Sequence, residues 1–336
     1  MAGEKVTIRD IAQKAGVSVS TVSRVITCSG RVNSKTRAHI ENLMKELGYK
    51  PNMAAQSLKT QRTRNIFLVV PDIVNPFYSN IAKTLQRYVS ERGYILTLYN
   101  TNEDYDEEVR AIESAGETYA GGIVFASVSS DKAIINRLLD LNIPAVLLNS
   151  YDKCQIDSVH GERAYGTYLA TTYLLENNHR RIAFAGGITS TTIGRSRKKG
   201  YLKALAEWSI PLDSRLVFEM VFSADSGYKA GKYFASLTER PTAICCANDM
   251  IAMGVLAAFR EEGIQVPKDV SITGMDDIVY SQISNPPLTS VTNDSDDFAW
   301  HSFRLLFSRI DGQYTGEARE IILGRELVIR DSVAKI

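Results

Sequence analysis

Several features that mark secreted, membrane-spanning and disulfide-bonded proteins are missing from this sequence. No run of about eighteen apolar residues, the minimum for a membrane-spanning helix, occurs in its 336 residues. Residues 1–9 carry charges without an apolar stretch, which argues against a secretory signal. The four cysteines have no CxxC spacing, and Cys245 and Cys246 lie together in an apolar run. We therefore expect buried free thiols in a cytoplasmic protein with no membrane segment.

Motifs that hold catalytic groups, cofactors or metals are missing as well. The four histidines are scattered, and none belongs to an HExxH sequence. The pairs Gly121-Gly122 and Gly186-Gly187 form neither a GxGxxG nor a Walker A loop. The adjacent Asp276-Asp277 are better explained by a capped loop than by acid–base chemistry. The sequence thus predicts no enzyme, no cofactor and no metal.

Charge is divided unevenly along the chain, although the total is only +1. Residues 1–64 contain 12 Lys and Arg against 4 Asp and Glu, a net charge of +8. Residues 65–336 hold the remaining 27 basic and 34 acidic residues, a net charge of −7. A basic head on an acidic body is typical of a nucleic-acid-binding module joined to a domain that avoids nucleic acid.

The basic head has the signature of three short helices. Thr7 and Asp10 form a capping box that starts a first helix ending near Ala15. Gly16 breaks that helix, and Ser18 can cap a second one over 19–26. A third helix is predicted over 34–47, with a glycine as its stop. Two short helices joined by a tight glycine turn predict a helix-turn-helix, whose second helix enters the DNA major groove.

One side of the second helix carries candidate DNA contacts. Arg24 is the best candidate for a base contact, because a guanidinium can donate two hydrogen bonds to guanine. Ser20 can bond either base type, and Val19 can pack on a thymine methyl. The remaining candidates of the head are hydroxyl side chains, of which the last two are expected at phosphates: Thr7, Thr21 and Ser23.

The segment after the head is a candidate hinge. Pro51 ends the helical head, and Asn52 can cap a stretch over 53–59 that is too short to hold a helix alone in water. Its alanines permit two such stretches to lie against each other in a dimer. Leu58 is then available as a wedge in the minor groove, or else as an ordinary linker residue that touches the body. The candidate DNA contacts of this segment are Ala55, Leu58 and Lys59.

From residue 65 onward, apolar strands alternate with helical stretches. Two series of strands are predicted: 66–70, 95–99, 122–125 and 145–148, then 182–185, 217–221, 243–246 and 270–273. Continuous apolar strands separated by helices predict parallel sheets covered on both faces. Two series predict two doubly wound lobes, whose ligand lies outside the carboxyl ends of the strands. The cleft between the lobes is thus the expected binding site.

Polar and aromatic residues directly follow these strands. Asn248-Asp249 and Asp276-Asp277 are polar pairs of this kind, and Phe222 is an aromatic example. Such side chains suit a polyhydroxylated ring, because vicinal hydroxyls take paired hydrogen bonds while the C–H face stacks on an aromatic ring. Taken singly, Asp249 and Asp276 are equally well placed as helix caps.

The ordered motifs of the head resemble those of the LacI/GalR repressors. The matching segments are 6–12 (VTIRDIA), 15–18 (AGVS), 20–25 (STVSRV) and 48–52 (GYKPN), and the resemblance extends across essentially the whole chain. It implies an all-α helix-turn-helix headpiece, a hinge, and a two-lobed α/β core of doubly wound parallel sheets like periplasmic binding proteins, at 1–50, 51–64 and 65–336. Lobe one is expected at about 65–161 and 293–322, and lobe two at about 162–292 and 323–336.

The resemblance also implies roles for single residues. Hinge helices of the family fold on DNA and kink a central base step with a leucine, which here is Leu58. By position, the effector pocket is lined by Phe77, Tyr78, Asn149, Arg197, Phe222, Asn248, Asp249 and Asp276. Thr27 stands where the family typically has Asn, Asn149 where several sugar-binding members have Asp, and Met275 where Tyr or Phe is frequent. The last two departures leave the effector open.

These expectations define a sequence-specific DNA-binding regulator that binds a palindromic operator as a homodimer. The expected effector is a small sugar or sugar phosphate, which releases the protein from the operator of carbohydrate-utilisation genes. Two alternatives stay open: a purine-type corepressor, and control by a phosphorylated carrier protein. A periplasmic binding protein shares the two-lobed design, but the basic head and the missing signal argue against it.

Overall fold

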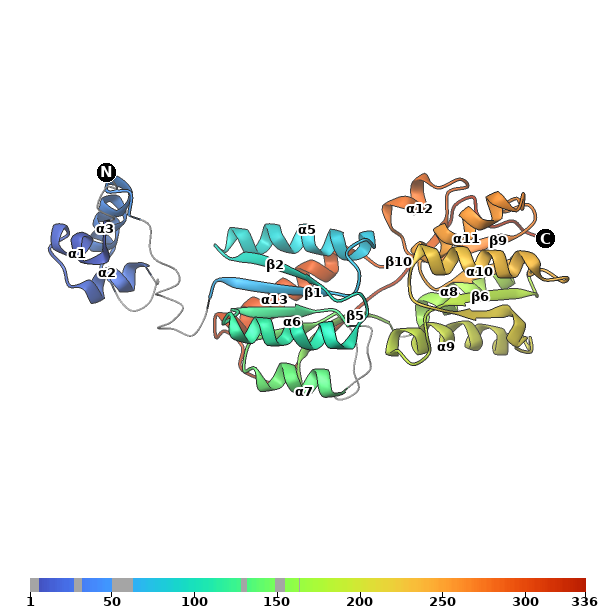
Figure 1. Ribbon diagram of the computed structural model, residues 1–336, viewed down its shortest axis with the longest axis horizontal. Helices are drawn as coiled ribbons and strands as arrows, with labels where there is room; N and C mark the ends of the chain where they lie inside the picture. Colours follow the sequence, from blue (N-terminus) through green and yellow to red (C-terminus); the bar gives the residue numbers. More distant parts are fainter. Residues whose placement is uncertain (1–5, 27–31, 50–62, 128–131, 149–154, 163) are drawn as a thin grey trace. The chain divides into compact units, whose positions relative to one another are not determined.

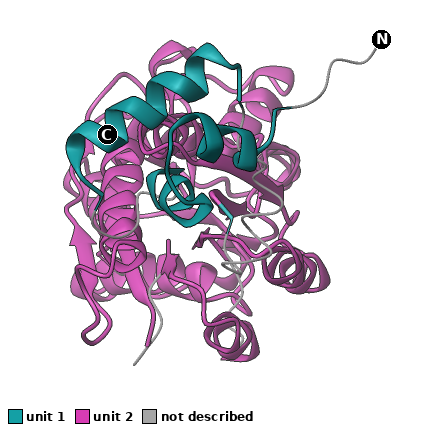
Figure 2. Ribbon diagram, turned by 90° about the vertical axis from the view of Figure 1, so that its left-hand side faces the viewer, with its two compact units in different colours: residues 1–63 teal, residues 64–336 magenta. Residues whose placement is uncertain are grey.

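The structure, a computed structural model, describes six stretches of the chain: residues 6–26, 32–49, 63–127, 132–148, 155–162 and 164–336 (Figure 1). The chain divides into two units, residues 1–63 and 64–336 (Figure 2). In these stretches, no helix has the length and apolar character that a membrane crossing requires.

The first unit contains three helices at bounds close to those predicted: α1 (Ile8–Lys14), α2 (Val19–Ile26) and α3 (Ser34–Glu46). The predicted capping box is present, because the Thr7 amide donates to the Asp10 carboxylate at 2.8 Å and the Asp10 amide donates to Thr7 Oγ1 at 3.4 Å. Gly16 makes the tight turn before α2 with a left-handed φ of +64°. Each helix contributes one fully buried side chain to the core: Ile11, Val22 and Ile40.

The second unit begins with a parallel sheet that lies between two pairs of helices. Its strands are β1 (Asn65–Val70), β2 (Ile95–Asn100), β3 (Gly122–Phe125), β4 (Ala145–Leu147), β5 (Asp157–Gly161) and β11 (Glu320–Leu323), in the order β11-β5-β4-β3-β1-β2. Its helices are α5 (Pro76–Glu91), α6 (Tyr105–Glu117), α7 (Lys132–Asp140) and α13 (Ser295–Ile310). Alternate residues of β1 face opposite sides, with Ile66 and Leu68 toward α5 and α13, and Phe67 and Val69 toward α6 and α7. We call these layers lobe one.

A second sheet and its helices form lobe two. The strands are β6 (Ile182–Gly186), β7 (Val217–Glu219), β8 (Ala243–Cys246), β9 (Ser271–Asp276), β10 (Thr289–Thr292) and β12 (Leu327–Val328), in the order β12-β10-β9-β8-β6-β7. The helices are α8 (Tyr165–Glu176), α9 (Thr192–Glu207), α10 (Ala224–Ser236), α11 (Asp249–Glu261) and α12 (Val279–Ile283), with a 3-10 turn η1 (Ser214–Leu216) before β7. The edge strand β12 runs antiparallel to β10, whereas the other pairs are parallel.

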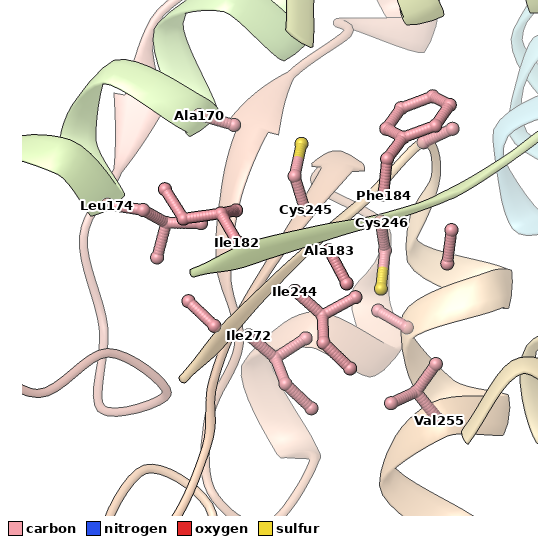
Figure 3. Close-up of a cluster of buried hydrophobic side chains, with 14 of the residues drawn as sticks. Ala170, Leu174, Ile182, Ala183, Phe184, Ile244, Cys245, Cys246, Val255 and Ile272 are labelled. Carbon is pink, nitrogen blue, oxygen red and sulfur yellow. The ribbon is translucent and has the colours of Figure 1, made fainter. Parts of the chain in front are cut away.

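One continuous apolar core fills lobe two. Figure 3 shows Phe184 of β6 and the two cysteines of β8 among side chains from α8 and α11, such as Leu174 and Val255. Cys245 and Cys246 are free and fully buried, as predicted. Burial raises the pKa of the Cys245 thiol to about 11, so this side chain packs as a neutral group at physiological pH.

Three connections join the lobes (Figure 1): β5 to α8, β10 to α13, and β11 to β12. The late elements α13 and β11 therefore belong with lobe one, although most of lobe two lies between them and the rest of lobe one in the sequence. The predicted fold class, a helical head followed by two doubly wound parallel sheets, is confirmed.

Strand β5 was absent from the predicted strands, because its sequence has no apolar run. Its first residue, Asp157, is fully buried and accepts hydrogen bonds from Arg309 at 2.7 and 2.8 Å. The Arg319 guanidinium and amide also donate to this carboxylate, at 2.6 and 2.8 Å. The Asp157 charge, which interrupts the apolar pattern of this strand, is thus neutralised by two arginines about 150 residues later in the sequence.

Candidate functional site

Helix α2 presents the predicted DNA-contacting residues on its outer side. Val22 and Val25 are buried against the other helices, whereas Val19, Ser20 and Arg24 are exposed. A helix that buries one stripe must offer the opposite stripe to solvent, and here that stripe holds the three predicted base-reading residues. This face is free to enter a groove of DNA.

Three of the predicted hydroxyl contacts, Ser20, Thr21 and Thr7, already have local partners. Ser18 Oγ lies 2.7 Å from Ser20 Oγ and 2.9 Å from Thr21 Oγ1, and it also accepts from the Thr21 amide at 3.2 Å. This confirms Ser18 as the cap of α2. Thr7 Oγ1 donates to the Asp10 carboxylate at 2.8 Å. Thr21 and Ser23 are only partly exposed, which suits contacts at the edge of a groove.

Several predicted residues lie outside the described stretches. These are the hinge residues Ala55, Leu58 and Lys59, the pocket residue Asn149, and Thr27. Their assigned roles remain predictions.

A pocket with about 690 Å³ of empty space, its open mouth included, lies between the two lobes. Lobe one lines it with Phe77, Tyr78, Leu148, His160 and Phe298, and lobe two lines it with Thr192, Ile193, Ser196, Arg197 and Met275. The connections between the lobes supply Glu162, Asn293 and Arg325. We call this the main pocket. Its size is that of a small-molecule site, and it lies where the carboxyl ends of both parallel sheets face each other.

Local structure explains why two aromatic rings lie at the N-terminus of α5. Asn75 caps this helix by accepting from the Phe77 amide at 3.0 Å, and Pro76 occupies the first turn. Phe77 and Tyr78 therefore lie at the helix start, directly beyond β1. Their rings meet edge to face, 5.0 Å between centroids, and Phe77 also contacts Phe298 of α13. Lobe one thus gives the pocket an aromatic wall.

Lobe two contributes a network of charged and polar groups. Arg197 Nη2 lies 3.3 Å from Asp276 Oδ1, and Asn293 donates to the same oxygen at 3.1 Å. Arg197 also donates to the Ala247 carbonyl and stacks over the Phe222 ring, 5.1 Å from its centroid. Burial raises the pKa of Asp276, although Arg197 opposes that rise. The lobe-two side of the site is therefore held in place by contacts within the protein.

The backbone at Asp276 supports a functional role for this residue. Its φ is +101°, in the left-handed region, which costs a residue other than glycine about 1–3 kcal/mol. Such conformations persist where the surrounding structure holds a side chain in a required direction. Here the hydrogen bonds from Arg197 and Asn293 hold the carboxylate.

A second, smaller pocket of about 370 Å³ adjoins the main one and shares Phe77, Tyr78, Ile193 and Arg197 with it. Its other lining residues include Phe222, Asn248 and Asp276, all predicted from the sequence, and Asp72 and Glu103, which were not. The Glu103 side chain accepts from the Phe222 amide, so this contact joins lobe one to lobe two. Burial raises the pKa of Glu103.

Asp249 is a predicted pocket residue that the structure does not bring to either pocket. Its carboxylate is fully buried and accepts from the Ile278 amide at 2.9 Å, from Ser281 Oγ at 2.7 Å and from Ser290 Oγ at 2.6 Å. The alternative reading of Asp249 and Asp276 as helix caps is also corrected, because Asn248 caps α11 and Ile278 precedes α12. Asp249 ties α11 to the segments that follow β9 and β10.

Sequence reasoning missed the residues that the lobe connections and β5 bring to the main pocket. His160 bonds the Gly161 carbonyl at 2.9 Å and the Glu320 carboxylate at 2.7 Å. Arg325 comes from the short link between β11 and β12. Neither follows a predicted strand, and so no pattern marked them. In the described part of the chain, no three His, Cys, Asp or Glu side chains gather as metal ligands.

Two family models match the chain. The model described as bacterial regulatory proteins, lacI family, matches residues 7–52, and the periplasmic binding protein-like domain matches residues 171–333. The HTH-type transcriptional regulator DegA of Bacillus subtilis is 35% identical over 99% of both chains. The HTH-type transcriptional repressor PurR of Vibrio vulnificus is 32% identical over 98% of this chain and 99% of its own.

Solved structures of similar proteins cover both units. The lac repressor dimer bound to operator and the anti-inducer ONPF matches with a TM-score of 0.82 at 27% identity, over 98% of this chain and 100% of that one. The complex of the transcriptional regulator CelR with cellobiose matches with a TM-score of 0.73 at 30% identity, over 97% of this chain and 99% of that one.

Proposed function

The chain belongs to the lacI family of bacterial regulatory proteins and is a DNA-binding transcriptional regulator, and from that premise we propose that it represses carbohydrate-utilisation genes until a small sugar or sugar phosphate binds between its lobes. The place of action is the cytoplasm, where chromosomal DNA lies. The proposed division of labour is a DNA-reading headpiece over 1–50, a hinge over 51–64 and an effector-binding, dimerising core over 65–336.

For DNA, we propose a homodimer on a palindromic operator. The similar lac repressor was solved as a dimer bound to operator. A two-fold dimer doubles the contacts of a small headpiece and reads the same half-site twice. Val19, Ser20 and Arg24 read bases, Thr7, Thr21 and Ser23 contact the backbone, and the hinge residues Ala55, Leu58 and Lys59 enter the minor groove.

Replacing Arg24 with Ala tests the DNA half of this proposal. The variant loses about 1–3 kcal/mol per half-site and selectivity at one base pair, because a bidentate guanine contact is removed. Fluorescence anisotropy on an operator obtained by in vitro selection measures the loss, with Arg9→Ala on the exposed side of α1 as a control. Equal losses on operator and random DNA would contradict base reading by Arg24.

For the effector, the observation that carries the proposal is the main pocket with its smaller neighbour, where the polar network of Arg197, Asp276 and Asn293 faces the aromatic wall of lobe one. Vicinal hydroxyls suit paired polar groups, and the C–H face of a sugar suits the Phe222 ring or the rings of Phe77 and Tyr78. The similar regulator CelR was solved with cellobiose.

A ligand in this position can control DNA binding because it touches both lobes. A ligand that binds one relative arrangement of the lobes better than the other shifts their equilibrium. The hinges that precede the two cores of a dimer then change separation. A coupling of about 1–3 kcal/mol, or about 5- to 150-fold in operator affinity, is sufficient.

The test titrates sugars, sugar phosphates and purines into the protein–operator complex. We expect a sugar or sugar phosphate to release the DNA, and we expect Arg197→Ala and Asp276→Ala to abolish that release. A true effector that bound both variants with unchanged affinity in calorimetry would overturn the pocket assignment.

A purine corepressor is the second candidate function. The observation behind it is the similarity to the PurR repressors at 31–33% identity, together with aromatic rings on which a base can stack. In this case a purine tightens operator binding rather than loosening it, and the same titration separates the two. Control by a phosphorylated carrier protein is the outcome to pursue if no small molecule changes DNA affinity.

A further inference from the structure

Arg325 lines the main pocket with a guanidinium that is only partly hydrogen-bonded within the described residues. Nε and Nη1 of Arg325 are buried and have no hydrogen-bond acceptor among the described residues. Arg197, the other arginine of the pocket, is bonded to Asp276 and to the Ala247 carbonyl. Two buried donor nitrogens without an acceptor are costly, since their desolvation is not offset by hydrogen bonds.

The protein makes room for this guanidinium at the pocket wall. A Cβ atom at residue 161 would overlap Nη2, Nε and Cζ of Arg325, so the guanidinium lies directly against Gly161, which itself lines the pocket. At Gly166 a Cβ would crowd Met275 but would stay at an ordinary 3.4 Å from Arg325 Cδ. Gly161 is thus the glycine that leaves room for the Arg325 guanidinium.

Positive potential at this end of the pocket comes from more than one source. Helix α8 starts here, at Ala164, without a side-chain cap, and its residues Gly166 and Thr167 line the pocket. A helix start attracts anions through its free amides. Burial and the nearby Arg197 charge lower the pKa of Arg325 to about 10, while Asp276 and Glu162 oppose that change. Arg325 therefore stays protonated at neutral pH.

We propose that Arg325 binds an anionic group, a carboxylate or a phosphate, on the small molecule that occupies the main pocket. The inference rests on the proposed function, because it takes the pocket as the effector site, and it adds that the effector is an acid rather than a neutral sugar. The Nε–H and Nη1–H groups point along different edges of the guanidinium, so each can donate a separate charge-assisted hydrogen bond to a carboxylate or phosphate. A neutral hydroxyl can accept a hydrogen bond but supplies no compensating charge.

Calorimetry on the full-length protein, at constant ionic strength, tests this with matched probes. The neutral probe is D-glucose, and the anionic probes are D-glucuronate, glucose 6-phosphate and inorganic phosphate. The variants are Arg325→Gln, which removes the charge, and Arg325→Lys, which keeps it. Arg260→Gln is the control, because it removes the same charge from an exposed site on α11.

We expect at least one anionic probe to bind the natural protein about tenfold or more tightly than glucose. Arg325→Gln should lose about 10- to 100-fold for that probe and little for glucose, because a charge-assisted pair is removed. Arg325→Lys should restore part of the loss, and Arg260→Gln should change nothing. The phosphate and glucuronate arms distinguish the two anion types.

The proposal is overturned if no anionic probe binds better than glucose, or if Arg325→Gln keeps the preference. Failure of the proposed function looks different. If sugars release operator DNA through Arg197 without any preference for an anion, the function stands and the role of Arg325 falls. If anions bind through Arg325 but no small molecule affects operator DNA, the anion site stands and the proposed regulation falls.

Discussion

Each lobe buries a carboxylate completely, and the two lobes stabilise it in opposite ways. In lobe one, Asp157 receives hydrogen bonds from Arg309 and Arg319. Burial alone would raise its pKa, but these arginines hold the pKa below its usual value. In lobe two, the hydrogen bonds that the described residues give Asp249 come from an amide and two serine hydroxyls. Burial, and then the charge of Asp276, raise its pKa to about 7.

The two lobes therefore differ in where their buried charges are paired. Lobe one neutralises Asp157 with Arg309 and Arg319, and none of these three residues lines either pocket. Lobe two keeps its cation Arg197 at the pocket, paired with Asp276, and leaves Asp249 without one. Arg325 is a second arginine at the pocket, and its Nε and Nη1 have no hydrogen-bond acceptor among the described residues. Arg325 lines the main pocket, where an anionic group on a ligand can accept from these nitrogens.

The largest expected effect tests the lobe-one half of this comparison. Asp157→Ala should lower the free energy of unfolding by about 3–5 kcal/mol, because it leaves Arg309 and Arg319 without their shared buried anion. Thermal and urea denaturation measure the loss. Asp140→Ala, at the exposed end of α7 in the same lobe, is the control and should change stability little. A loss for Asp157→Ala no larger than that of the control would mean that the cluster is not a stabilising centre.

The next effect tests the lobe-two half through pH. Since the pKa of Asp249 is raised to about 7 in the folded protein, its protonated form favours folding. Its contribution is complete below the unfolded value of about 3.9 and is lost as pH rises through about 7. The loss is at most on the order of 4 kcal/mol between these limits. Asp249→Asn should remove this part of the pH dependence in urea titrations from pH 4 to 8.

Asp157 gives the free energy of unfolding a pH dependence of the opposite sign in the same titrations. Its lowered pKa means that its contribution is present above the unfolded value and is lost only as pH falls further. The acid side of the stability curve should therefore be unchanged in Asp249→Asn. A variant that shifted the acid side instead, and kept the loss toward pH 8, would contradict the assignment of a neutral Asp249.

The third effect asks whether lobe two holds the ligand more strongly than lobe one. Arg197→Ala should weaken effector binding by about 100-fold, because the side chain joins Asp276, Ala247 and the Phe222 ring. Phe77→Ala in the lobe-one wall should cost less, because an aromatic stacking contact contributes about 0.5–1.5 kcal/mol. Calorimetry compares the two with Arg195→Ala, whose guanidinium bonds the Thr189 and Ser190 carbonyls at the surface. The reverse ranking would place the main binding energy in lobe one.

The sequence predicted the parts of this molecule that follow from local pattern. Strands at 122–125 and 243–246 match their predicted bounds, because uninterrupted apolar runs between helices have few other readings. The capping box at Thr7 is equally local. Of the predicted pocket residues, Arg197 and Asp276 meet because Asp276 ends β9 and Arg197 lies in α9, the helix that follows β6 at the same edge of the sheet.

What the sequence did not predict depends on partners that are distant along the chain. Strand β5 requires Arg309 and Arg319 to offset Asp157, and no local pattern signals that pairing. Arg325 reaches the pocket only because the chain crosses between the lobes a third time. Asn248 and Asp249 are neighbours in a polar pair and both are buried, but the first turn of α11 makes Asn248 the helix cap and places the Asp249 carboxylate against Ser281 and Ser290.

The smallest expected effect tests the contact that crosses from lobe one to lobe two. Glu103 accepts from the Phe222 amide, and burial raises its pKa, with Asp72 adding to the rise and Arg197 opposing it. The protonated form therefore favours the arrangement seen here, and that preference is lost as pH rises through the raised pKa. If this arrangement binds the effector, affinity should weaken a few-fold from pH 5 to 7.

Glu103→Gln keeps an acceptor for the amide without the charge, so it should bind at least as tightly and show no such slope in calorimetry. Glu113→Gln, exposed on α6, should keep the slope of the natural protein. An unchanged slope in Glu103→Gln would show that the lobes do not close on this carboxyl.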